Sequence, residues 1–133
     1  MLLSSYGTLR YSREDGQHRL VVEVDQELAD YYRSLIPKWI KTNRPRWPAH
    51  VTVVRPYKEA VPNLEPWGKY ESQTVDFCYE NYLHTGKVYY WINVFCKKLE
   101  EIRAELGLPV TSEFTRPPEG FLKCFHCTIC NTK

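Results

Sequence analysis

Two short stretches of the sequence each place a histidine and a threonine two positions apart. His50 and Thr52 lie in "PAHVTVV", and His126 and Thr128 lie in "KCFHCTIC", so the two histidines are 76 positions apart. The neighbouring residues are β-branched or otherwise apolar, which is typical of β-strands. Because successive side chains of a strand point to opposite faces, each histidine shares a face with its threonine. The residues between and beside them are expected to face the core.

An imidazole beside a hydroxyl on a rigid strand suits the cleavage of a phosphodiester. This reaction needs a base that deprotonates the nucleophile, a ribose 2′-hydroxyl or a water, and an acid that protonates the leaving oxygen. Histidine titrates near neutral pH, so one imidazole of a pair can be neutral while the other is charged. The hydroxyls can donate hydrogen bonds to the phosphate oxygens. We therefore predict one catalytic site, with no cofactor and no metal, formed by His50, Thr52, His126 and Thr128. The two other histidines, His18 and His84, lack such a threonine and are interpreted as structural.

A metal site is the competing interpretation of the second stretch. Cys124, Cys127 and Cys130 have the C-x-x-C-x-x-C spacing that also occurs in zinc and iron–sulfur sites. Such sites need a tight turn between ligands, and the stretch contains neither glycine nor proline. In an extended strand Cys127 points away from the other two cysteines, so the metal interpretation is the less favoured one. The odd total of five cysteines instead predicts free thiols in a reducing cytosol.

The composition predicts one domain over residues 1–133. A hydrophobic content of 43% and a charged content of 26% are ordinary for a soluble globular protein. The net charge of +2 does not indicate a protein that coats duplex nucleic acid. No apolar run reaches the length of about 18 residues that a membrane span requires. The N-terminus lacks the features of a secretory signal.

Hydrophobic patterns and turn residues predict an α+β fold with a repeated order of elements. Strands are expected over residues 6–12, 18–25, 50–57, 74–83, 88–96 and 121–130, and helices over 26–36 and 97–107. Each His-x-Thr strand follows a strand and a helix. The order of elements and the motif are repeated, but the sequence itself is not, because the two halves share little sequence identity.

The paired motifs, read here as "HVTV" and "HCTI", resemble the signature of the 2H phosphoesterase superfamily. The resemblance covers about residues 5–131. It implies two similar lobes, each an antiparallel sheet with a packed helix, and a catalytic cleft between them. It also implies that the four motif residues are catalytic, without saying which histidine is the base and which the acid.

Within this superfamily the chain looks most like the small phage enzymes that defeat CBASS, a bacterial anti-phage immune system. The stretches that carry this resemblance are "VEVDQELADYYRSLIPK", "AHVTVVR", "LEEIRAELGLP" and "RPPEG…CFHCTI". It implies metal-independent hydrolysis of 3′–5′ bonds in cyclic di- and trinucleotide messengers such as cyclic GMP-AMP, in the cytoplasm of an infected bacterial host. Two alternatives stay open: RNA with 2′,3′-cyclic ends or 2′–5′ linkages as substrate, and a sponge that binds cyclic nucleotides without cutting them. Members of this branch continue past the second motif with a closing segment, whereas this sequence reaches only Lys133, so either a lid is missing or another loop replaces it.

Strand alternation also provides candidates for binding a nucleobase. Within 88–96, Tyr89 and Trp91 share the face opposite the expected core, and a base stacked on either is worth about 1–3 kcal/mol. Tyr6, on the first strand, is a weaker candidate. Ordinary packing is an equally favoured interpretation of these aromatic residues. Arg44, Arg46 and Arg116 lie in loops that lead to the motif strands and are interpreted mainly as solvated surface charges.

Overall fold

The computed structural model describes residues 1–112 and 115–133, which form an antiparallel sheet and two helices. In chain order the elements are β1 (Leu2–Glu14), β2 (Gln17–Val24), α1 (Gln26–Ser34), β3 (His50–Val54), β4 (Thr74–Glu80), β5 (His84–Thr85), β6 (Tyr89–Phe95), α2 (Lys97–Glu105) and β7 (Phe125–Asn131). The predicted α+β class is confirmed. Both helices and the six predicted strands are present, with shifted ends, and β5 is an additional strand.

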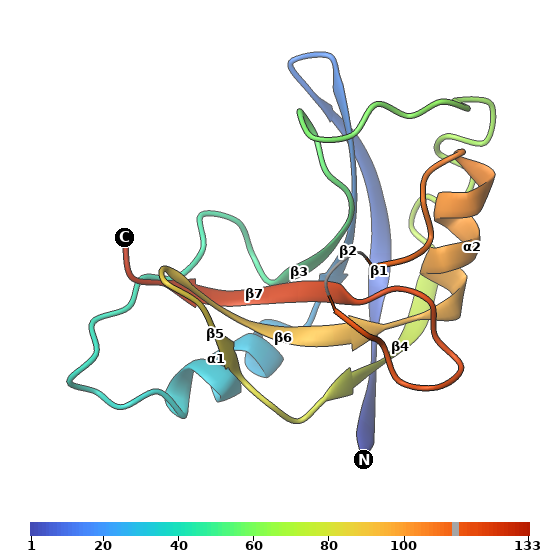
Figure 1. Ribbon diagram of the computed structural model, residues 1–133. Helices are drawn as coiled ribbons and strands as arrows, with labels where there is room; N and C mark the ends of the chain where they lie inside the picture. The colour runs from blue at the N-terminus through green and yellow to red at the C-terminus, as the bar shows by residue number, and fades with distance from the viewer. Residues whose placement is uncertain (113–114) are drawn as a thin grey trace.

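The sheet closes on itself. Strands β1, β2 and β3 pair in that order, and β4, β6 and β7 form a second antiparallel set. The two sets join twice, through β3 with β7 and through β1 with β4. Two units with the same order of strand, strand, helix and strand therefore share one sheet. Figure 1 shows the resulting twist, with β6 and β7 side by side and steeply inclined to β1.

The hairpin between β1 and β2 depends on Asp15 and Gly16. Their φ angles are 50° and 79°, as a two-residue type I′ turn requires. Glu14 consequently pairs with Gln17, and the ladder continues up both strands. β1 is longer than predicted because its first half also pairs with β4.

The helices cover the two strands that carry the motifs. α1 begins at Asp25, whose carboxylate accepts a hydrogen bond from the backbone of Glu27 at 2.9 Å. α2 is followed by Gly107, which has a φ of +80°, the conformation that favours glycine after a helix. α1 packs against β7 and α2 against β3, and both contribute to one continuous hydrophobic core. Within the described ranges, neither helix has the length and apolar character needed to span a membrane.

Two predicted strand boundaries are wrong for identifiable reasons. β3 ends at Val54 because the Arg55 N–H donates to the Glu59 side chain instead of a strand. β7 begins at Phe125, not at residue 121, because the N–H groups of residues 122 and 123 donate to the carboxylate of Glu100. Between two of the predicted strands, residues 84 and 85 form the additional strand β5, which pairs with β6.

Candidate active site

The two motif strands are neighbours in the sheet. Val51 of β3 pairs with Cys127 of β7 in an antiparallel ladder, so the residues on either side also face each other. The histidine of each motif therefore lies opposite the threonine of the other motif. The facing pairs are His50 with Thr128, and Thr52 with His126.

Burial alternates as predicted through both motifs, up to Val53 and Ile129, after which Val54 and Cys130 are buried as well. Val51 and Val53 are 0% and 2% exposed, and Cys127 and Ile129 are each 1% exposed. The four motif residues are partly or fully exposed on the other face. The sequence-predicted catalytic residues are thus brought together on one face of two adjacent strands, opposite the core.

A cavity of about 530 Å³ opens on this face. Its volume lies within the range of small-ligand sites. Thr52, His126 and Thr128 contribute to one wall. Described residues between α2 and β7 contribute to another, namely Pro109, Thr111, Ser112, Thr115, Lys123 and Cys124. Among the described residues His50 is not part of this wall, although it lies directly across from Thr128.

The His50 ring is fixed by the backbone just before β3. Its Nδ1 lies 2.7 Å from the carbonyl oxygen of Pro48. Since a carbonyl oxygen only accepts hydrogen bonds, Nδ1 carries a proton and Nε2 is the nitrogen left for chemistry. Burial lowers the pKa of His50, and nearby Arg19 lowers it further, against the opposing effects of Pro48 and Glu23. In the free protein at neutral pH, His50 therefore presents a basic Nε2.

The second histidine, His126, has cationic surroundings. Burial lowers its pKa, and His84, Lys123 and Arg55 lower it further. Its ring is tilted against Trp91 with 5.7 Å between ring centroids. Because two cations reduce its proton affinity, a bound anion that offsets their charge favours protonation of His126.

A hydrogen-bonded chain that the sequence analysis missed lies beside His126. Trp91 Nε1 donates to Asn93 Oδ1 at 3.1 Å, and Asn93 Nδ2 lies 3.0 Å from His84 Nε2. Because an indole only donates, the Asn93 amide must turn its oxygen to Trp91 and its nitrogen to His84, which accepts. Asn93 is 4% exposed and is the strand partner of His126. The chain fixes the Trp91 ring, which also stacks on His84 at 5.6 Å.

Three basic side chains contribute to the cavity wall, namely Arg55, Arg103 and Lys123. Arg103 is 3% exposed and is bound to Glu59 at 2.7 and 3.1 Å. Burial on its own raises the pKa of Glu59, but hydrogen bonds from Arg103 and from the Arg55 backbone outweigh it and lower the pKa. The charge of Arg103 is thereby neutralised, and the wall keeps an excess of positive charge from the other two cations.

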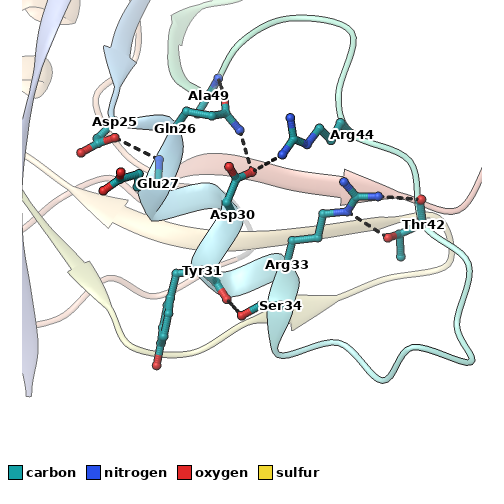
Figure 2. Close-up of polar contacts among 10 residues, drawn as sticks. All are labelled: Asp25, Gln26, Glu27, Asp30, Tyr31, Arg33, Ser34, Thr42, Arg44 and Ala49. Carbon is teal, nitrogen blue, oxygen red and sulfur yellow. Dashed lines mark hydrogen bonds and ion pairs between the residues drawn. The ribbon is translucent and has the colours of Figure 1, made fainter.

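Helix α1 holds the chain that leads into the first motif (Figure 2). The backbone N–H of Ala49, next to His50, donates to Gln26 at 3.0 Å, and Gln26 also donates to Asp30 at 3.1 Å. Asp30 binds Arg44 at 3.1 Å, so Arg44 serves here as an ion-pair partner of the helix. Arg33 contacts the side chain and carbonyl of Thr42 at 3.1 and 2.9 Å. These contacts fix the approach to β3.

The three predicted base-binding residues lie in different places. Trp91 contacts His126 and is the strand partner of Thr128. Tyr89 is 43% exposed at the end of β6, with the Lys133 ammonium 4.9 Å from its ring centre. Tyr6 is 67% exposed on β1, and two strands separate β1 from β7 in either direction around the closed sheet. The structure therefore brings Trp91, but not Tyr6, beside the motifs.

The cysteines of the second motif are free thiols, as are the other two. Cys127 is buried in the core, where burial raises its pKa to about 12. Within residues 1–112 and 115–133, no three His, Cys, Asp or Glu side chains are grouped in a way that would hold a metal ion.

Comparison of the chain with protein-family models, curated proteins and solved structures found no match. The site itself combines two imidazoles, two threonine hydroxyls, a fixed indole and a basic cavity wall. This set is suited to binding an anion and to moving protons at neutral pH.

Proposed function

We propose that the protein is a metal-independent phosphodiesterase that hydrolyses 3′–5′ bonds in cyclic di- and trinucleotides. The observation that carries this proposal is the facing arrangement of the two His-x-Thr motifs beside a basic cavity. A protein that only binds a nucleotide needs hydrogen-bond donors and stacking surfaces. Binding alone does not require two imidazoles that each lie across from a hydroxyl, whereas acid–base catalysis requires a pair of groups that exchange protons near neutral pH.

In the proposed reaction His50 and His126 share the roles of base and acid. One imidazole takes the proton from a ribose 2′-hydroxyl or a water as the new P–O bond forms. The other gives its proton to the leaving oxygen as the old P–O bond breaks. Each role is worth about 10²–10⁴-fold in rate. Thr52 and Thr128 donate hydrogen bonds to the non-bridging oxygens, where negative charge is stabilised.

The lowered pKa values of the two histidines support a role for the bound substrate in protonating the histidine that acts as the acid. Both histidines have lowered pKa values in the free protein, so the acid has to gain its proton when the anionic phosphate binds. Such a phosphate offsets the positive charge around His126 and raises its proton affinity. Substrate binding thus prepares the acid–base couple.

The proposal extends to the fold and to the biological setting. In this proposal, the two units that share the sheet correspond to the two lobes of a 2H phosphoesterase, and each lobe carries one motif. The substrates are the cyclic messengers of CBASS immunity, and their cleavage lets a phage evade that defence. The resemblance of the motif segments to phage enzymes supports this part of the proposal.

Product analysis by mass spectrometry tests the proposal. The purified protein is incubated in excess EDTA with cyclic di- and trinucleotides, a 2′,3′-cyclic RNA end and a 2′–5′-linked oligonucleotide. We expect linear products from the cyclic oligonucleotides and loss of activity in His50→Ala and His126→Ala. His18→Gln, a histidine on β2 outside the site, serves as the matched control. Full activity in both alanine variants contradicts the proposed mechanism. Preference for the RNA substrates contradicts the proposed substrate class. Recovery of intact ligand from a tight complex indicates a sponge that binds the nucleotide without cutting it.

A further inference from the structure

Arg55 and Lys123 extend the two motif strands in the same direction. Arg55 comes three residues after Thr52, and Lys123 comes three residues before His126. Because β3 and β7 are antiparallel, both steps lead toward the same end of the strand pair. Three residues of extended chain span about 10 Å. The two cations therefore belong to the same cavity as Thr52, His126 and Thr128, but to a different part of it.

The positive charge at this end of the cavity is not balanced by the described side chains. Glu59 holds Arg103 with both carboxylate oxygens and approaches the Arg55 guanidinium only at 3.8 Å. Among residues 1–112 and 115–133, no carboxylate oxygen lies within 4.0 Å of the Lys123 ammonium. Two like charges that share a cavity repel each other, and an anionic ligand removes this repulsion.

The backbone around Lys123 is held in place by hydrogen bonds. The carboxylate of Glu100, a residue only 7% exposed, accepts the backbone N–H groups of Leu122 and Lys123 at 2.9 and 3.2 Å. The next N–H, that of Cys124, donates to the Ser112 hydroxyl at 2.6 Å. The lysine ammonium lies 5.6 Å from the centre of the Phe125 ring. The backbone that carries Lys123 is thus fixed on both sides, which distinguishes it from a solvated surface lysine.

We infer that Arg55 and Lys123 form a second phosphate-binding subsite, which takes a phosphate of the ligand other than the one being cleaved. The inference rests on the proposed function and narrows it to ligands with at least two phosphates. A cyclic dinucleotide satisfies this condition, because one phosphodiester reaches the histidines while the other meets the cations. A terminal 2′,3′-cyclic phosphate on a single nucleoside leaves the subsite empty.

Binding measurements with linear diadenylates test the subsite without relying on catalysis. The three ligands carry no terminal phosphate, a 5′-phosphate or a 3′-phosphate, and their Kd values are measured by calorimetry at one fixed salt concentration. We expect one of the phosphorylated ligands to bind wild type about 10-fold more tightly than the unphosphorylated one, as a charge-assisted contact allows. Lys123→Gln and Arg55→Gln should each reduce this preference to about 2-fold or less. Lys41→Gln, an exposed lysine before the first motif, should keep it.

A parallel kinetic measurement separates the subsite from the proposed function. Because Lys123→Gln also raises the pKa of His126, kcat/KM is taken from the pH-independent plateau of each profile, where we expect the variant to lower the value for cyclic diadenylate about 10-fold more than that for adenosine 2′,3′-cyclic phosphate. An equal loss for both substrates, or an unchanged phosphate preference in both variants, overturns the subsite even if the protein is an active phosphodiesterase. If the protein cleaves nothing but both variants lose the phosphate preference, the subsite stands and the proposed function fails.

Discussion

Thr52 and His126 face each other across the neighbouring antiparallel strands β3 and β7, in the register set by Val51 and Cys127. The same register sets His50 against Thr128. Neither motif is therefore a self-contained site, because the hydroxyl that lies across from each imidazole belongs to the other unit. This arrangement makes the contribution of each threonine separately testable.

The threonine hydroxyls should matter for rate more than for folding. Thr52→Val keeps the shape of the side chain but removes its donor, and loss of one donor to a developing oxyanion costs about 10²–10³-fold in kcat. We expect a loss of this size for Thr52→Val in cyclic dinucleotide cleavage, measured under saturating substrate. Thr52→Ser, which restores the hydroxyl, should recover most of the activity. Equal activity of the valine and serine variants would remove the hydroxyl from the mechanism.

The two histidines should respond to different cations. Lys123 is among the groups that lower the pKa of His126, and Arg19 is among those that lower the pKa of His50. Removing a positive charge makes the imidazolium less unfavourable, so the pKa of the affected histidine should rise. We expect Lys123→Gln to move the NMR titration of His126 to higher pH and to leave that of His50 in place.

Arg19→Gln provides the reciprocal measurement, with His50 moving and His126 unchanged. The same variants identify the acid and the base, because the limb of the kcat/KM profile that moves belongs to the histidine whose titration moved. A shift of both histidines in either variant would show that the two cations do not act on separate sites.

Much of the fold follows from local sequence signals. Asp15-Gly16 defines a hairpin, Asp25 and Gly107 mark helix ends, and alternation assigns His50 and His126 to the face opposite the core. Closure of the sheet depends on β1 pairing with β4 and on β3 pairing with β7, which join segments far apart in the sequence. No local pattern encodes such a pairing, because it results from how the two units pack.

The parts of the site that were missed are those formed by contacts distant in sequence. Strand alternation puts Asn93 on the same face as Trp91, but its bonds to Trp91 and His84 depend on β5 pairing beside β6. Similarly, the role of Lys123 depends on Glu100, which lies 23 residues away and fixes the chain before β7. A buried carboxylate that binds backbone N–H groups has no characteristic spacing in a sequence.

The buried amide of Asn93 should stabilise the fold through its two partners. Asn93→Leu leaves the Trp91 indole N–H without its acceptor and removes one of the partners of His84 Nε2, at a cost of about 1–3 kcal/mol for an unsatisfied buried group. We expect a loss of this size in the free energy of urea unfolding. Trp91→Phe removes the indole donor, so the double variant should be less destabilised than the sum of the two single variants. Strict additivity would show that Asn93 and Trp91 are energetically independent.

The ion pair between Glu59 and Arg103 should make stability depend on acid pH. Arg103 is 3% and Glu59 12% exposed at their side chains, and breaking a buried pair by removing one partner typically costs about 3–5 kcal/mol. Glu59→Gln should therefore be strongly destabilised in urea unfolding at pH 7.

The pKa of Glu59 is lowered in the folded protein from its usual value of 4.5, so its ionised form stabilises the fold above that pH. This stabilisation is lost as the pH falls through the lowered pKa. The wild type and the glutamine variant should consequently converge in stability at acid pH, whereas Glu101→Gln, an exposed change on the same helix as Arg103, should follow the wild type throughout. A constant difference between wild type and Glu59→Gln across the acid range would mean that Glu59 acts through packing and not through its charge.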